Sequence, residues 1–158
     1  MRKNLNDLPL CRLSVPTPFE VGPVNLYLIT APEVVLVDSG PGMPGAMGRF
    51  EKELAAAGMT PESLQKIVVT HAHQDHYGLA QALSRRSGAP IYASPIEGRQ
   101  LQNDPALQAF YLQLLETAGM TSEMQARQRE QFREIRASGE PLEAFLPIAQ
   151  LEIGRAHV

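Results

Sequence analysis

The sequence predicts an α/β fold in which short apolar strands alternate with helices in one layered domain. Four runs rich in Val, Ile and Leu have the length of buried strands, and each is bounded by turn residues or by a stretch with helical spacing. The chain of 158 residues is long enough for one domain with one core. The expected strands are residues 24–30, 33–38, 66–70 and 90–94.

Turn residues delimit the first two expected strands. Gly22 and Pro23 mark a turn before the first strand, and the Ser-Gly-Pro-Gly segment 39–42 ends the second in a tight loop. Residues 44–57 then have apolar side chains at helical spacing, and Gly58 is a suitable stop. This part of the chain therefore predicts two strands followed by a helix.

The next elements lead into and out of a cluster of histidines. Thr60 and Pro61 are suitable for the cap and first turn of a short helix. The strand at 66–70 delivers the chain directly into the cluster, and a helix over 77–87 ends at Gly88.

Residues 100–137 predict a pair of helices. The first begins near Asp104 and ends at Gly119, and Ser122 with Gln125 fits a capping box for the second. The pair is either an insertion that lies over a site or an ordinary packed hairpin. The aromatic residues that would line a pocket in the first case and pack as core in the second are Phe110, Tyr111 and Phe132.

Composition and charge narrow the classes of function. The net charge is −3, so no nucleic-acid partner is expected. Apolar runs stay well below the ~20 residues of a membrane span, and the N-terminus has no apolar signal core, so we expect a cytoplasmic protein without a membrane segment. The single cysteine, Cys11, excludes an internal disulfide and is interpreted as a small apolar residue.

Three of the four histidines lie within six residues. His71 and His73 are two residues apart, so their imidazoles point the same way in an extended segment. Asp75 and His76 follow where the chain turns into the next helix. Imidazoles and a carboxylate that converge at the end of a strand can bind one or two divalent metal ions, zinc by preference and iron or manganese as alternatives. A histidine-rich surface loop is the other interpretation.

The segment Thr-His-Ala-His-Gln-Asp-His-Tyr-Gly at 70–78 resembles the His-x-His-x-Asp-His signature of the metallo-β-lactamase superfamily. Residues 22–29 and 35–40 are similar to the opening strands of that family, so the resemblance covers roughly residues 15–97. It implies the αββα sandwich, of which this chain would hold the N-terminal half to two-thirds, with the helical pair as an insertion. The glyoxalase-type hydrolases are the most similar branch.

The resemblance implies roles for five residues. His71 and His73 would bind the first metal ion, and Asp75 and His76 the second. Asp75 would also orient the attacking water or assist the leaving group. Asp38 would support the ligands without touching the metal, although an aspartate that begins the turn after a strand is the alternative reading.

The resemblance also implies an activity. A metal-bound hydroxide would attack a small acyl substrate, such as a thioester, an ester or a lactone. A mononuclear-iron dioxygenase that acts on persulfides is similar in the same motif. A non-catalytic binding protein is the third possibility.

The remaining ligands of the family are expected from a later part of the fold. Asp104 and His157, the only later aspartate and histidine, lack the expected context. Residues 153–158 match one translated frame of a sequencing adapter, so we expect an incomplete domain at 1–152 followed by a non-native tail; a genuine short tail is the alternative. On this hypothesis the chain alone is inactive and the activity belongs to a full-length parent.

Overall fold

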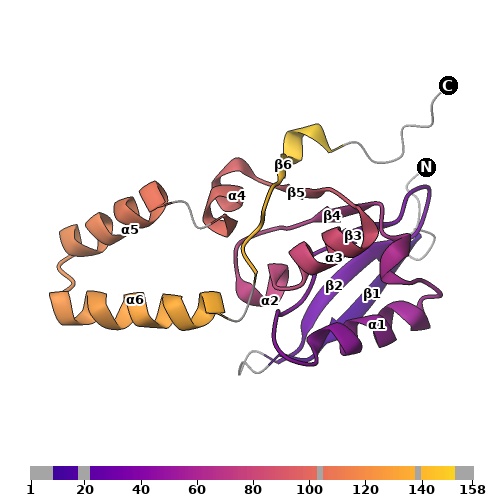
Figure 1. The fold of residues 1–158 in the computed structure, drawn as a ribbon, viewed down its shortest axis with the longest axis horizontal. Coiled ribbons are helices and arrows are strands. Elements are labelled where there is room, and N and C mark those ends of the chain that lie inside the picture. The colour runs from indigo at the N-terminus through magenta and orange to yellow at the C-terminus, as the bar shows by residue number, and fades with distance from the viewer. Residues whose placement is uncertain (1–8, 18–21, 103–104, 138–139, 152–158) are drawn as a thin grey trace, which may run out of the picture.

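The computed structural model describes residues 9–17, 22–102, 105–137 and 140–151, and its centre is one six-stranded mixed sheet (Figure 1). The strands lie in the sheet in the same order as in the chain. They are β1 (Leu10–Val15), β2 (Val24–Ile29), β3 (Val35–Val37), β4 (Lys66–Val68), β5 (Ile91–Ala93) and β6 (Leu146–Pro147).

The direction of the strands changes at β3. Strands β1, β2 and β3 pair antiparallel, whereas β3, β4, β5 and β6 pair parallel. Parallel strands need crossover connections, and helices supply them between β3 and β5. As a result, the carboxyl ends of β3, β4 and β5 meet at one edge of the sheet.

The helices connect and cover these strands. The α-helices are α1 (Ala46–Ala56), α2 (Gln74–Tyr77), α3 (Ala80–Ser87), α4 (Pro95–Leu101), α5 (Pro105–Thr117) and α6 (Ser122–Ala137). Two single-turn 3₁₀ helices, η2 (Pro61–Ser63) and η3 (Ile148–Gln150), complete the described elements.

The main core lies between one face of the sheet and the helices α1 and α3. Phe50 and Leu54 of α1 and Leu83 of α3 are fully buried against strand residues such as Leu26 and Ile67. Each such side chain contributes about 1.5–3 kcal/mol of apolar burial. Cys11 packs at the edge of this core as a free cysteine, in agreement with its interpretation as a small apolar residue.

A smaller apolar cluster lies on the opposite face of the sheet. Val35, Val68 and Tyr92 form it, with Leu151 packed alongside. The described residues therefore supply one sheet with one helical layer, which is one β layer and one α layer of the four-layer sandwich predicted from the sequence. The α/β class is confirmed.

The structure corrects several boundaries. The helix predicted over 77–87 begins three residues later, as α3 at Ala80. A short helix that was not predicted, α2, precedes it and begins directly after the extended residue His73. Strand β1, helix α4 and strand β6 were not predicted; β1 alternates buried and exposed side chains, with Arg12 on the exposed face. The cap predicted at Ser122 is wrong by one residue, because the hydroxyl of Thr121 accepts the hydrogen bond from Met124 N at 3.3 Å.

Helices α5 and α6 form the predicted pair and lie beside the sheet in Figure 1. Phe110 and Tyr111 are 63% and 41% exposed, so neither side chain is core in the described part of the protein. The side chain of Phe132 lies outside the described residues, as do Asp104 and His157. The boundary predicted at 152 and 153 also falls outside them, and the pocket reading remains a prediction.

Within the described residues, no helix combines the length and the apolar character needed to cross a membrane.

Candidate metal centre

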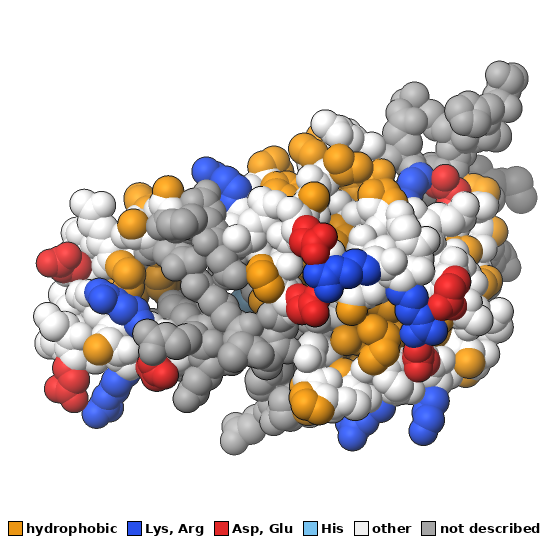
Figure 2. All heavy atoms as spheres, viewed as in Figure 1, with side chains coloured by type: hydrophobic (Ala, Val, Ile, Leu, Met, Phe, Trp, Pro, Cys, Tyr) orange, Lys and Arg blue, Asp and Glu red, His pale blue; other side chains and the backbone are white. Residues whose placement is uncertain are grey.

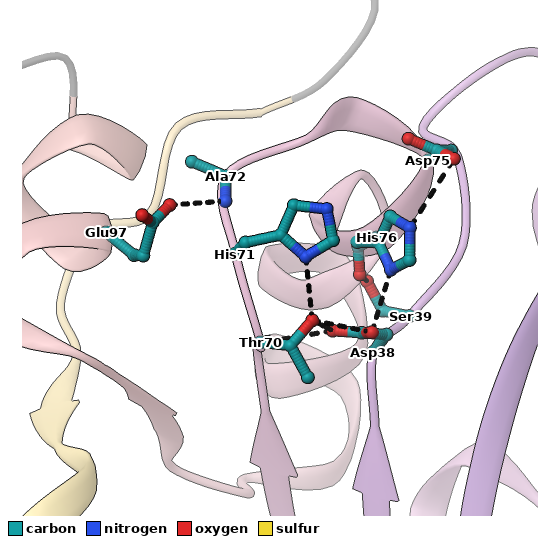
Figure 3. Close-up of polar contacts among 8 residues, drawn as sticks. All are labelled: Asp38, Ser39, Thr70, His71, Ala72, Asp75, His76 and Glu97. Carbon is teal, nitrogen blue, oxygen red and sulfur yellow. Dashed lines mark hydrogen bonds and ion pairs between the residues drawn. The ribbon is translucent and has the colours of Figure 1, made fainter.

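The predicted ligands lie at the edge where the parallel strands end. Asp38 follows β3, the segment that begins with Thr70 and His71 follows β4, and Glu97 follows β5 in the first turn of α4 (Figure 3). Carboxyl ends of parallel strands are common binding sites in α/β folds, because the loops that leave them diverge around a crevice.

Asp38 is the buried centre of the hydrogen-bond network at this edge. The residue is only 6% exposed, and its φ of 60° is in the left-handed region that aspartate tolerates better than most residues. One carboxylate oxygen, Oδ1, accepts from Thr70 N at 2.8 Å. The other, Oδ2, lies 2.8 Å from Nδ1 of His76.

The same network assigns the tautomers of two histidines. The hydroxyl of Thr70 lies 2.9 Å from Asp38 Oδ2, and an ionised carboxylate only accepts, so the hydroxyl proton is donated to Asp38. The Thr70 oxygen then accepts from Nδ1 of His71 at 2.9 Å. By the same reasoning, Nδ1 of His76 carries a proton. Both imidazoles thereby keep Nε2 for a cation, which is how carboxylates orient metal-binding histidines.

The loop after β3 also holds the backbone of the second histidine. Ser39 N donates to the carbonyl oxygen of His76 at 2.6 Å, and Ser39 Oγ lies 3.2 Å from the same oxygen. Gly78 packs so closely on this loop that a Cβ there would lie 2.0 Å from Gly42 N. Residues Asp38 to Gly42 thus fix both the ring and the backbone of His76.

The three imidazoles of the motif lie close together beside this hydrogen-bond network. The ring centroid of His71 lies 4.5 Å from that of His73, in an edge-on arrangement, and 4.1 Å from that of His76. Burial lowers the pKa of His71 below its ordinary value, and repulsion from His76 and His73 lowers this pKa further. The neutral imidazole, which is the form that binds metal, is therefore favoured.

Asp75 faces the second of these imidazoles. Its Oδ2 lies 3.5 Å from Nε2 of His76, which is beyond a good hydrogen bond. With the proton on Nδ1, Nε2 of His76 carries a lone pair that faces a lone pair of the Asp75 carboxylate. A cation between these two atoms would bind both. Two ligands of one tetrahedral zinc ion lie about 3.3 Å apart, given bonds of ~2.0–2.1 Å, so this spacing fits the donor set.

The side chains at this edge have the chemistry of a metal site but not yet its arrangement. The residues are those that bind divalent metal ions, but no group of three or more His, Cys, Asp or Glu side chains is arranged to hold an ion in the described ranges. Occupation would require the side chains to reorient or further ligands to join them. The structure brings His71, His73, Asp75, His76 and Asp38 together; their assignment as ligands and support stays a prediction.

Sequence reasoning missed one residue of this edge. Glu97 Oε2 accepts a hydrogen bond from Ala72 N at 2.7 Å, and Ala72 is the residue between His71 and His73. A signal was present, because Ser94, Pro95 and Glu97 follow a predicted strand with the pattern of a capped helix start.

Comparison with known proteins assigns the family. The family model described as "Metallo-beta-lactamase superfamily" matches residues 19–153. The chain belongs to this superfamily, and the resemblance carried by the histidine motif is confirmed.

Individual relatives match over shorter stretches. The chain is 38% identical over 72 residues to the Bacillus subtilis (strain 168) protein named "Probable metallo-hydrolase YqjP", covering 46% of this chain and 23% of that protein. It is 31% identical over 83 residues to exodeoxyribonuclease WalJ of Streptococcus pneumoniae, covering 52% of this chain and 29% of WalJ.

A solved structure is similar over most of the chain. The metallo-beta-lactamase family protein TTHA1429 from Thermus thermophilus superposes with a TM-score of 0.70 at 30% identity, over 88% of this chain and 45% of that protein. The chain thus spans less than half the length of each of these relatives.

Proposed function

We propose that the protein to which this chain belongs is a metal-dependent hydrolase that cleaves a small acyl substrate, namely a thioester, an ester or a lactone. One observation supports the metal site most directly: Asp38 orients His76 through Nδ1 while Asp75 lies 3.5 Å from its Nε2. The name of the Bacillus subtilis relative supports the hydrolytic class.

The residues of the candidate site would have different roles in catalysis. His71 and His73 would hold one ion and Asp75 with His76 a second, or all four would share one. A bound zinc ion lowers the pKa of water toward neutrality and so supplies a nucleophile at physiological pH. Asp75 Oδ2 would accept a hydrogen bond from the attacking water and orient it toward the acyl carbon. Asp38 would keep the proton on Nδ1 of His76 throughout.

Charge supports a small substrate rather than a polyanion. Several basic side chains on the face shown in Figure 2 lie beside acidic ones. Arg85 pairs with Glu140 and Glu143, and Arg86 pairs with Glu51 and Glu62. The net charge of −3 points in the same direction.

Metal titration tests the site first. The metal-free chain would be titrated with Zn²⁺, Fe²⁺ and Mn²⁺, beside His71→Ala, Asp75→Asn and, as a control, Glu116→Gln on the exposed surface of α5. We expect Zn²⁺ binding that both site variants weaken at least about 10-fold and the control leaves unchanged. Equal binding by all four proteins would refute the site.

Turnover tests the substrate class. The product of the complete reading frame would be assayed with a thioester, an ester and a lactone, and we expect hydrolysis that Asp75→Asn reduces by about 10²-fold or more. Iron as the preferred metal, with oxygen uptake on a persulfide, would instead establish the dioxygenase.

A second candidate function is nucleic-acid hydrolysis. The similarity to an exodeoxyribonuclease favours it, and the same motif could serve phosphodiester cleavage. The net charge of −3 and the ion pairs of Arg85 and Arg86 count against it, because phosphate backbones are bound by Lys and Arg that are free to contact them. Degradation of single- or double-stranded DNA by the same preparation, lost in Asp75→Asn, would move this function ahead.

A further inference from the structure

We infer that Glu97 is a positioning residue for the metal centre: its carboxylate holds the segment that carries His71 and His73. The inference rests on the proposed metal site and adds to it a residue outside the histidine motif. Its basis is the hydrogen bond from Ala72 N to Glu97 Oε2 at 2.7 Å, shown at the left of Figure 3.

The backbone amide of Ala72 lies outside the strands and helices of the described residues. It lies between the two histidines in a segment of bends, after β4 has ended and before α2 begins, where no strand or helix of the described residues pairs its backbone. A hydrogen bond from this amide to an ionised carboxylate is about twice as strong as one to a neutral acceptor. The contact therefore restrains the backbone on which both imidazoles are carried.

Helix α4 gives Glu97 a firm base. Ser94 Oγ caps the helix by accepting from Glu97 N at 3.2 Å. On its far side Gly98 lies so close to Phe145 that a Cβ would come within 2.2 Å of the ring. Leu101 at its end is 2% exposed, and its carbonyl oxygen accepts from Leu142 N at 3.1 Å. Because α4 is held from two sides, the Glu97 carboxylate has a defined position.

The topology explains why this residue reaches the site from so far along the chain. Strands β4 and β5 are parallel neighbours, so the residues after each strand arrive at the same edge. Asp38 after β3 restrains His76, and Glu97 after β5 restrains the segment of His71 and His73. The histidine segment after β4 thus lies between two carboxylates from the flanking strands.

A simpler interpretation is that Glu97 only stabilises the N-terminus of α4. Acidic residues in the first turn of a helix are favoured by the helix dipole, typically by about 0.3–1 kcal/mol. That role would be unaffected by the distance to Ala72, so the two readings differ in what happens to the Ala72 amide and to the metal.

The test uses four variants of the full chain. Glu97→Ala removes the acceptor, and Glu97→Gln keeps an oxygen that can accept from Ala72 N. Ser94→Ala weakens the cap of α4 without touching Ala72, and Gln100→Ala alters an exposed residue of the same helix. The readouts are the hydrogen-exchange rate of the Ala72 amide by NMR in the metal-free protein and the affinity for Zn²⁺ by chelator competition.

We expect Glu97→Ala to accelerate exchange of the Ala72 amide by about 10-fold or more and to weaken Zn²⁺ binding by roughly 10-fold or more. Glu97→Gln should stay within about 3-fold of wild type in both readouts. Ser94→Ala should have a clearly smaller effect than Glu97→Ala, and Gln100→Ala should change neither readout. An effect of Ser94→Ala as large as that of Glu97→Ala would overturn the inference in favour of helix stability.

Failure of the inference is separable from failure of the proposed function. A wild-type chain that binds no metal would refute the proposed metal site, and with it the role of Glu97 there. Wild-type binding that Glu97→Ala leaves unchanged, with unchanged exchange of the Ala72 amide, would refute the inference alone.

Discussion

Asp38 joins two loops through one buried carboxylate. It accepts from the backbone and hydroxyl of Thr70 on one side and from His76 on the other. Because both oxygens face donors and the residue is 6% exposed, an amide cannot replace it: its NH₂ group would meet a donor on one side. The residue thus acts on the fold and on the candidate site through the same contacts.

Asp38→Asn should therefore lower the free energy of unfolding by about 1–3 kcal/mol, the cost of a buried unmatched donor. Asparagine tolerates the left-handed backbone, so strain does not enter. The same change should weaken Zn²⁺ binding by roughly 10–100-fold. Urea unfolding and metal titration measure the two effects, with Glu116→Gln as the exposed control; unchanged unfolding would contradict the network.

Gly78 is needed for space rather than for backbone conformation. A Cβ at this position would lie 2.0 Å from Gly42 N and 2.6 Å from Pro41 C, and backbone atoms cannot rotate away. We expect Gly78→Ala to destabilise the chain by about 1–3 kcal/mol or more. Gly48 in α1 has nothing within 4 Å, so Gly48→Ala should stabilise by roughly 0.5–1 kcal/mol. Equal effects in urea unfolding would contradict this packing.

At the scale of elements, α1 and α5 show opposite uses of an aromatic residue. Phe50 of α1 is fully buried between its helix and the sheet, whereas Phe110 of α5 is 63% exposed. Both lie in stretches of the sequence whose apolar side chains recur at helical spacing. The helices differ in what their apolar faces can pack against: α1 packs on the sheet, whereas α5 lies beside the sheet (Figure 1).

Phe50→Ala should therefore cost about 3–5 kcal/mol of unfolding free energy, because the cavity cannot close against the sheet. Phe110→Ala should change it by no more than about 0.5 kcal/mol. Thermal or urea unfolding of the two variants checks the contrast. A large loss in Phe110→Ala would mean that the pair of α5 and α6 packs on a surface through this residue.

At the scale of the whole molecule, the centre joins segments separated by about sixty residues of chain. The loops after β3, β4 and β5 hold each other through Asp38, Thr70 and Glu97. A metal ion that binds the histidine segment while these loops hold it in place, and does not bind the unfolded chain, must stabilise the entire domain.

Zn²⁺ at about 100 times its dissociation constant should raise the unfolding free energy by about 2.7 kcal/mol, which for a domain of this size corresponds to a rise in Tm of roughly 5–10 °C. A chelator should reverse the shift. His76→Ala should abolish it, and Gln100→Ala should retain it, in differential scanning calorimetry. A shift of the same size in His76→Ala would place the bound zinc elsewhere.

The class of fold, the long elements and the histidine cluster could all be predicted from local patterns in the amino-acid sequence. Apolar runs such as 66–70 and the His-x-His-x-Asp-His spacing are local patterns, which are visible in the sequence before the pairing of the strands is known. Strand β1 differs from the continuous apolar runs, because it alternates buried and exposed side chains, with Arg12 on the exposed face.

Tertiary structure decided the rest of the site. The tautomers of His71 and His76, the central place of Asp38 and the contact of Glu97 with Ala72 depend on atoms 25 to 38 residues apart. A sequence pattern shows how far apart two residues are along the chain. A hydrogen bond depends instead on how close their atoms are in space, which here is decided by which strands are neighbours in the sheet. The parallel pairing of β3, β4 and β5 brings residues that are far apart in the chain to the same edge of the sheet.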